Sequence, residues 1–310
     1  MRVFVAGAGG TLGRRLVPRL VERGHEVVGT TRSPDKRRDI EALGAEAVLM
    51  DGLDAASVGE AIGRAEPEIV VHELTALAGM GDVRNFDREF AATNELRTRG
   101  TDNLLTAAAA VGVRRFVAQS YAGWPNERTG GPVKTEDDPL DANPPRNQRR
   151  SFEAIRHVER AATSAPLEGL VLRYGGFYGP GTSIADGGAH AELLRQRKFP
   201  IVGDGGGVWS FVHIDDAAEA TALAVERGAP GIYNVVDDEP ARVADFLPYL
   251  AQCVGAPPPR RVPVWLARLV AGEAGVSVMT QVRGSSNAKA KCELGWELRH
   301  PSWREGFREL

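Results

Sequence analysis

Three glycines near the start of the chain have the spacing of a phosphate-binding turn. Gly7, Gly10 and Gly13 follow the apolar segment 2–6 (RVFVA) and open an amphipathic run with apolar residues at 12, 16, 17 and 20. A strand, a glycine turn and a helix in this order present backbone N–H groups and the positive end of a helix dipole to a pyrophosphate. We therefore expect a dinucleotide to contact Gly7, Gly10, Thr11, Leu12 and Gly13.

The residues after the second expected strand indicate which dinucleotide binds. The segment 25–30 (HEVVGT) leads into Thr31, Arg32 and Ser33, where an NAD site usually carries Asp or Glu for the ribose hydroxyls. A guanidinium beside two hydroxyls suits a 2′-phosphate, so NADP is favoured and NAD is the alternative. Arg32 as a solvated surface arginine is the competing interpretation.

A second group of expected cofactor contacts follows the third strand. Asp51, with Gly52 and Leu53, comes after the segment 45–50 (AEAVLM), where a carboxylate can meet the adenine amino group. A helix N-cap is the other interpretation of Asp51.

These residues need a parallel sheet to position them. Helical and strand patterns alternate through the first half of the chain, which predicts an α/β, Rossmann-type doubly wound parallel sheet with a smaller mixed α/β lobe after it. A long helix is expected from about 86 to 111, and another from 151 to 163. The expected strands are 2–6, 25–30, 45–50, 68–72, 113–119 and 169–172.

The chain is expected to divide into two lobes around a ligand cleft. Residues 1–176, with 208–228, are assigned to an NAD(P)-binding domain, and 177–207 with 229–310 to a substrate-binding lobe that includes a strand at 231–236. A lobe over the carboxyl ends of parallel strands is the usual place for a ligand.

Composition narrows the class of protein. The 310 residues are 43% hydrophobic and 25% charged, with a formal net charge of −3, so no basic field favours nucleic acid or an anionic membrane. Cys253 and Cys292 have no metal-type spacing, and no metal site is expected. Two isolated thiols, no membrane-spanning run and a strand in place of a signal peptide predict a cytoplasmic protein with a small-molecule substrate.

Several motifs in one order resemble the extended short-chain dehydrogenase/reductase superfamily, of the NAD-dependent epimerase/dehydratase type. The resemblance covers almost the whole chain. It depends on the stretches GAGGTLG at 7–13, Gly100-Thr101 with 103–105 (NLL), Arg173 with 178–181 (YGPG), 211–216 (FVHIDD) and 288–296 (AKAKCELGW). It implies a nicotinamide held beside a Ser, Tyr and Lys triad, with the Tyr as acid/base.

This chain departs from that triad. Counting back from Glu159, the Tyr position falls on Ser151 and the Lys position on Ile155, and no Tyr-x-x-x-Lys occurs anywhere in the sequence. The Ser position falls on Tyr121, or on Ser120 after a shift of one residue. The resemblance therefore implies a non-standard catalytic set.

Three residues are the candidates for that catalytic set. Tyr121 ends a central strand and is expected to keep a pKa near 10, which suits proton donation; the alternative is that it only lines the pocket. Ser151 either relays a proton or is an exposed serine in the first turn of a helix. Ser120 is the third candidate.

The resemblance also implies contacts around the nicotinamide and the substrate. The position at which nucleotide-sugar enzymes carry arginine is Trp209, which disfavours a sugar nucleotide and favours an apolar or polycyclic substrate. Glu73 either points away from the dinucleotide or serves as a base, and Arg97 stands where the family commonly has Asn. The expected aromatic pocket is Trp124, Phe152, Tyr178 and Trp209, and the expected backbone contacts to the nicotinamide are Leu74, Thr75, Ala76, Tyr174 and Phe177.

The leading hypothesis is an NAD(P)-dependent oxidoreductase that acts on a small, largely apolar carbonyl or carbinol compound. The alternatives are an epimerase, dehydratase or isomerase that uses the nucleotide transiently, and a non-catalytic nucleotide sensor. Relatives often pair through the two long helices, so a homodimer is expected as well.

Overall fold

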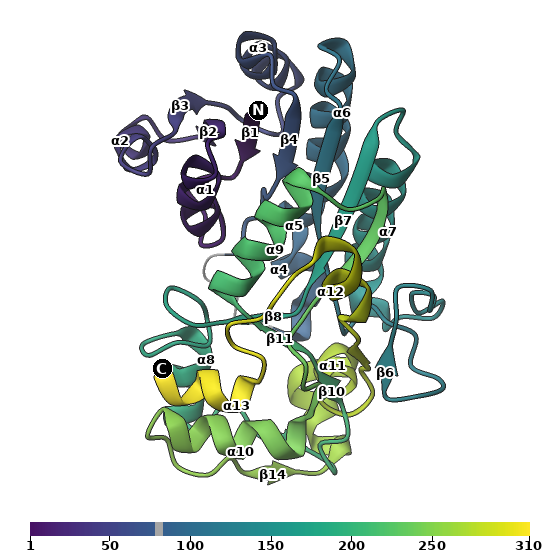
Figure 1. The fold of residues 1–310 in the computed structure, drawn as a ribbon. Coiled ribbons are helices and arrows are strands. Elements are labelled where there is room, and N and C mark those ends of the chain that lie inside the picture. The colour runs from purple at the N-terminus through teal and green to yellow at the C-terminus, as the bar shows by residue number, and fades with distance from the viewer. Residues whose placement is uncertain (78–82) are drawn as a thin grey trace.

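A seven-stranded parallel sheet forms the centre of the larger lobe (Figure 1). The protein is described by a computed structural model over residues 1–77 and 83–310. The strand order is β12-β7-β5-β4-β1-β2-β3. The strands are β1 (Arg2–Ala6), β2 (Glu26–Thr31), β3 (Glu46–Leu49), β4 (Ile69–His72), β5 (Arg115–Tyr121), β7 (Glu168–Tyr174) and β12 (Gly231–Val235).

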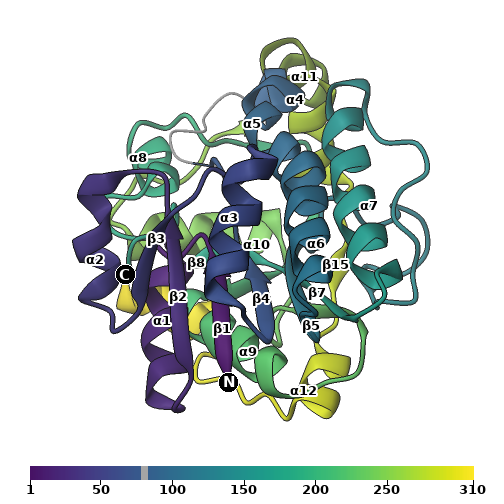
Figure 2. The same ribbon diagram turned by 90° about the horizontal axis from the view of Figure 1, so that it is seen from above.

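The predicted doubly wound α/β fold is confirmed. Strand side chains alternate between two apolar layers: Val3 and Val5 face one layer, whereas Phe4 and Ala6 face the other. The first layer is covered by α1 (Gly13–Glu22), α2 (Arg37–Glu41), α9 (Ile214–Glu226) and α12 (Ala288–Leu294), and the second by α3 (Ala55–Ala65), α6 (Thr101–Ala110) and α7 (Arg149–Ser164) (Figure 2).

The chain order reverses between β1 and β4, which lie side by side in the sheet. β1 leads to β2 on one side, whereas β4 leads to β5 on the other, so the loops after β1 and β4 separate and leave a crevice at their carboxyl ends. This crevice is the place where a Rossmann-type sheet binds its ligand.

One expected helix is interrupted. In place of one helix over 86–111, the chain forms α4 (Phe86–Glu89), α5 (Ala91–Glu95), a π-helical turn, η3 (Leu96–Gly100), and then α6. A π turn carries one extra residue per turn and is frequent at functional sites.

The smaller lobe is built from short strand pairs and four helices around its own core. Its pairs are β8 (Gly176–Tyr178) with β11 (Phe211–His213), β9 (Ile201–Val202) with β14 (Arg261–Val262), β10 (Val208–Trp209) with β13 (Ala241–Arg242), and β6 (Val133–Lys134) with β15 (Gly284–Ser285). Its helices are α8 (Ala189–Arg195), α10 (Val243–Cys253), α11 (Val264–Thr280) and α13 (Trp303–Gly306). In the part of the chain that the structure describes, no helix has the length and apolarity needed to cross a bilayer.

The expected lobe boundary differs from the structure at β6 and β10, which fall in 1–176 and 208–228 but pair with β15 and β13 of the smaller lobe, and at one further strand. The strand at 231–236 was assigned to the smaller lobe, but β12 pairs with β7 in parallel, from Gly231 beside Leu170 to Val235 beside Tyr174. Its apolar side chains therefore complete the edge of the main sheet. The rest of the proposed division stays a prediction.

Candidate active site

The loop between β1 and α1 is closely packed around Gly7 and Gly13 but has free space around Gly9. Gly7 has φ +104°, and a Cβ atom on Gly13 would lie 2.4 Å from the Gly7 carbonyl oxygen, so both positions need glycine. By contrast, a Cβ atom on Gly9 would meet nothing within 4 Å. Within the described chain, the amides of Thr11 and Leu12 have no acceptor. These open amides at the start of α1 fit a dinucleotide pyrophosphate.

A single methyl group at Gly13 is expected to disturb this loop. Gly13→Ala places that methyl against the Gly7 and Ala8 carbonyl oxygens, at 2.4 and 2.6 Å, so we expect a loss of about 1–3 kcal/mol in the free energy of unfolding and a loss of nucleotide binding. Gly9→Ala is the matched control, because its methyl has room. Urea unfolding of both variants tests this expectation, and equal stabilities would contradict it.

The expected adenosine contacts lie at and just after the carboxyl ends of β2 and β3. Arg32 is exposed, and its guanidinium has no hydrogen bond or ion pair with any described residue, while Thr31 Oγ1 accepts from the Ser33 amide at 3.1 Å. Asp51 Oδ1 accepts from the Leu53 amide at 3.0 Å, whereas Asp54 caps α3. The structure thus assigns the cap to Asp54 and leaves the adenine role of Asp51 a prediction.

The residues that follow β4 pack against the glycine loop. A Cβ atom on Gly7 would lie 2.7 Å from the Glu73 carbonyl oxygen, and the Leu74 side chain packs on Gly52. Thr75 is exposed, and the Ala76 amide donates to Thr93 Oγ1 at 3.0 Å. The expected contacts 74–76 therefore border the crevice between β1 and β4.

Glu73 directly follows β4, and its side chain belongs to a chain of hydrogen-bonded polar groups. Tyr174 Oη lies 2.9 Å from Glu73 Oε1 and 2.8 Å from Thr221 Oγ1, and the Phe177 ring packs on Tyr174 with ring centroids 5.3 Å apart. Burial raises the pKa of Glu73 to about 8, because the charged carboxylate loses its hydration. The role of a base, which the sequence analysis considered for Glu73, stays a prediction.

Glu73 is expected to make stability depend on pH. Its pKa is higher in the folded chain than in the unfolded chain, so its contribution is complete below about pH 4.5 and is lost as the pH rises through about 8. Each unit of pKa difference corresponds to about 1.4 kcal/mol. The difference in the free energy of unfolding between Glu73→Gln and wild type is therefore expected to shift by at least about 1 kcal/mol in favour of the variant as the pH rises from 5 to 8. Urea unfolding at several pH values measures this, with exposed Glu41→Gln as control; parallel curves would contradict it.

The end of β5 presents Ser120 and Tyr121 to opposite sides of the sheet. Ser120 Oγ donates to Glu159 Oε1 at 2.8 Å, and Glu159 is held by Arg173, whose Nε and Nη2 each lie 2.7 Å from a carboxylate oxygen. All three residues are buried. These contacts give Ser120 a role in positioning α7 against the sheet, and its predicted catalytic role is untested.

Tyr121 lies at the edge of an aromatic cluster that we call the β5 cluster: Phe86, Phe90, Tyr121, Trp124 and Phe152. Its ring centroid is 5.8 Å from that of Trp124, and Trp124 in turn contacts Phe152 at 5.2 Å. Burial raises the pKa of Tyr121 to about 12, in place of the expected value near 10. The phenol therefore keeps its proton at neutral pH.

The two positions that the sequence analysis matched to the family's Tyr and Lys hold buried residues of α7. Ser151 is fully buried, which corrects the interpretation of an exposed serine; it donates to Asp87 Oδ1 at 2.8 Å and accepts from Asn94 Nδ2 at 3.0 Å. Ile155 packs in the β5 cluster. Ser151 is thus fixed between α4, α5 and α7, and a role in catalysis stays a prediction.

Three of the four expected pocket aromatics meet. Trp124 and Phe152 belong to the β5 cluster, and Trp209 packs against it while its Nε1 donates to the Val278 carbonyl at 2.8 Å. Tyr178 is the exception and corrects the expected pocket. It is fully buried in the core of the smaller lobe, 5.3 Å from Phe307, because its strand β8 turns that side chain away from β5.

The structure adds Arg97 and Asn94, which were not among the expected site residues. Both are buried beside the β5 cluster, and Arg97 lies on the π turn close to Tyr121 and Glu159. The sequence did contain one indication of this role: Arg97 stands at a position where the family commonly has Asn.

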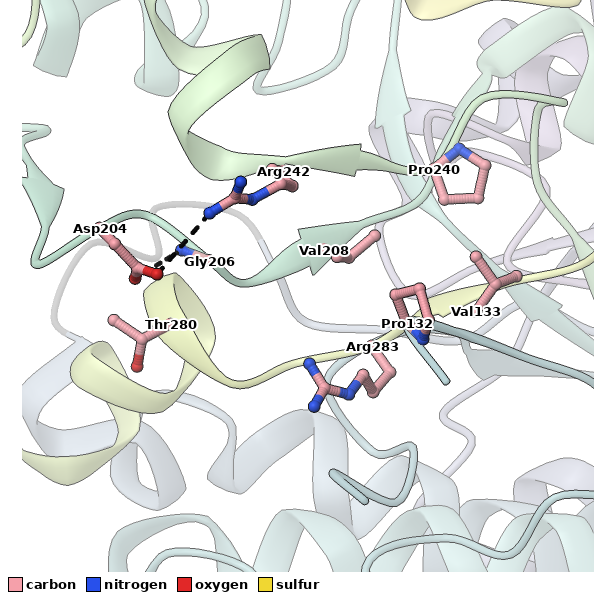
Figure 3. A pocket seen from close by; sticks show the side chains of 9 residues that line it. All are labelled: Pro132, Val133, Asp204, Gly206, Val208, Pro240, Arg242, Thr280 and Arg283. Atoms are coloured by element: carbon pink, nitrogen blue, oxygen red, sulfur yellow. Dashed lines mark hydrogen bonds and ion pairs between the residues drawn. The ribbon is translucent and has the colours of Figure 1, made fainter. Parts of the chain in front are cut away.

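A separate surface pocket of about 490 Å³ lies on the far side of strand β10 (Figure 3). Val208 lines it, whereas the next residue, Trp209, packs on the β5 cluster. Its other wall carries Arg242, paired with Asp204 at 3.6 Å. This pocket is therefore not part of the crevice between β1 and β4.

Comparison with known proteins identifies the family. The family model described as "NAD dependent epimerase/dehydratase family" matches residues 3–235. The chain belongs to this family. It is therefore an NAD-binding enzyme of the oxidoreductase and epimerase type, as the motifs predicted.

Two curated relatives and one solved structure are similar to this family member over most of its length. A 3-diazoavenalumate denitrifying reductase of Streptomyces sp is 44% identical over 309 residues, with 99% of each chain covered. A 2-alkyl-3-oxoalkanoate reductase of Stenotrophomonas maltophilia is 30% identical, covering 83% of this chain and 77% of the relative. The Thermus thermophilus UDP-glucose 4-epimerase in complex with NAD has a TM-score of 0.74 at 25% identity, covering 99% and 97%.

Proposed function

We propose that this enzyme is an NADPH-dependent reductase of a small aromatic substrate. The observation that carries the proposal is Tyr121, a half-buried phenol at the carboxyl end of β5, which pairs with β4, and its ring packs on Trp124. Because burial raises its pKa to about 12, it supplies a proton rather than removes one. Reduction is the direction that needs a proton donor.

The residues of the chain bind the cofactor, position the substrate and donate the proton. When bound, the reduced nicotinamide supplies a hydride. The loop 7–13 and the start of α1 hold the pyrophosphate, and Tyr174 and Phe177 border the crevice beside Glu73. Trp124 and Phe152 are buried and pack one behind the other next to the Tyr121 ring, so they hold that ring in place, and Tyr121 gives its proton to a substrate oxygen.

The relative at 44% identity suggests the first substrate to test. Its printed name specifies a diazo substrate and a denitrifying reduction. In the same chemistry here, hydride forms a new C–H bond as the C–N bond breaks and N₂ leaves. The 30% relative is named as a reductase of an oxo acid, so an aromatic ketone is the second substrate class.

The experiment is NADPH consumption with 3-diazoavenalumate and with aryl ketones, with product analysis by mass spectrometry. Reduction predicts one NADPH oxidised for each molecule of product. An isomerised product with no net NADPH consumption would favour the epimerase or dehydratase alternative. NADPH binding without turnover of either class would favour a nucleotide sensor.

Arg32 is proposed to select NADPH over NADH. Its exposed guanidinium has no partner among the described residues and follows β2, where a 2′-phosphate would lie. Since a hydrogen bond to a charged group contributes about 1.5–3 kcal/mol, Arg32→Ala is expected to weaken NADPH binding at least about tenfold and to leave NADH binding nearly unchanged. Fluorescence titration with both nucleotides tests this, with exposed Arg38→Ala as control. Equal losses for the two nucleotides would contradict it.

The predicted homodimer through the helices around 86–111 and 151–163 is also a proposal. In the structure the first segment forms α4 to α6 and the second forms α7, and these helices lie next to one another on one face of the sheet. Light scattering coupled to size-exclusion chromatography tests it, and a mass of about 33 kDa would contradict it.

A further inference from the structure

Arg97 carries a positive charge into the interior of the protein. The residue is only 2% exposed, and its Nε and Nη1 atoms are buried with no hydrogen-bond partner among the described residues. A buried cation without a partner costs several kcal/mol of stability, so such a side chain is rare unless something binds to it. Burial lowers the pKa of Arg97 only to about 10, so it stays charged at neutral pH.

The neighbouring charges do not balance it. Among the residues that the structure describes, Glu159 is the carboxylate whose charge acts on Arg97, and both of its oxygens already bind Arg173, with Ser120 as a third donor. Two guanidinium groups and one carboxylate leave this buried cluster with a net charge of +1. Tyr121 keeps its proton and adds no negative charge. The cluster therefore lacks one anion.

A second polar atom without a partner lies on the same face of the helix. Asn94 is three residues before Arg97, a spacing that places both side chains side by side. Its Nδ2 donates to Ser151, but its Oδ1 is buried and has no partner among the described residues. The interior next to Tyr121 thus holds two unused donors of Arg97 and one unused acceptor of Asn94.

We propose that Arg97 binds a carboxylate group of the substrate, and so selects aromatic acids over neutral aromatic compounds. The inference rests on the proposed function and names its substrate class. The π turn places the guanidinium next to Tyr121, so the bound anion lies close to the proton donor at the edge of the β5 cluster. An anion at this point completes the charge of the cluster, and a guanidinium is the side chain best suited to a carboxylate.

The test compares two probes, 4-hydroxycinnamate and its neutral amide, on wild type, Arg97→Met and Arg97→Lys. With NADPH present, wild type is expected to bind the acid at least tenfold more tightly than the amide. Arg97→Met loses this preference, and Arg97→Lys retains part of it. The exposed Arg99→Met is the control, since it removes one charge from the same turn. Quenching of tryptophan fluorescence, which Trp124 is placed to report, measures the affinities.

Thermal unfolding separates this role from a structural one. If the anion is missing from the cluster, Arg97→Met removes an uncompensated charge and raises the Tm by several degrees in the absence of ligand. Wild type with no preference for the acid, or Arg97→Met with the preference intact, would overturn the inference. NADPH titration of the same proteins tests the proposed function separately. If the wild-type chain binds no NADPH, the proposed function is wrong, whichever of the two probes the chain prefers.

Discussion

Replacing Tyr121 with Phe is expected to lower turnover by about 10²–10⁴-fold, the usual contribution of a positioned acid. The ring of the variant still fills its place against Trp124, so NADPH affinity and stability should stay near those of wild type. Turnover is followed by NADPH consumption with the substrate that wild type accepts. Tyr249→Phe is the matched control, because it removes a phenol hydroxyl that donates to the Arg304 carbonyl in the smaller lobe.

The pH dependence of turnover gives an independent check on Tyr121. Because burial raises its pKa to about 12, loss of this proton should not lower the rate of wild type until the pH approaches that value. A Tyr121→Phe variant with full activity would show that the proton comes from elsewhere, and Glu73 would then be the next group to replace.

Breaking the buried ion pair between Glu159 and Arg173 is expected to have the largest effect on stability. Arg173→Met leaves the Glu159 carboxylate without its bidentate partner in the interior, and the loss of one member of such a pair costs about 3–5 kcal/mol. Urea unfolding at neutral pH measures the change. The exposed pair of Glu60 and Arg64 is the control, since Glu60→Gln should change stability by less than about 1 kcal/mol.

The same variant also tests how α7 is held on the sheet. Glu159 lies on α7, whereas Arg173 and Ser120 lie on β7 and β5. If Arg173→Met unfolds at the same urea concentration as wild type, the pair contributes nothing net, and packing alone holds the helix.

Much of the larger lobe could be predicted because its signals are local. The strand 2–6, the glycine turn and the helix after it are neighbours in sequence, and the structure has β1, the loop and α1 in the same places. Arg32 and Tyr121 were also placed at the ends of their strands, because the carboxyl end of a parallel strand can be read from where its apolar run stops.

What the sequence did not reveal depends on contacts between distant segments. The π turn at 96–100 adds one residue to a helix whose apolar spacing barely changes, so periodicity predicted a single long helix. The position of β12 beside β7 is decided by tertiary pairing. Tyr178 and Tyr121 are the same residue type near strand ends, and only the direction of β8 shows that Tyr178 faces the core of the smaller lobe.

The most direct measurement for the central claim is a titration of the purified chain with NADPH, NADP, NADH and NAD, repeated on Gly13→Ala. The account predicts saturable binding of the phosphorylated pair, weaker binding of the other pair, and loss of both when the loop carries the extra methyl. A wild-type chain that binds none of the four nucleotides would contradict it.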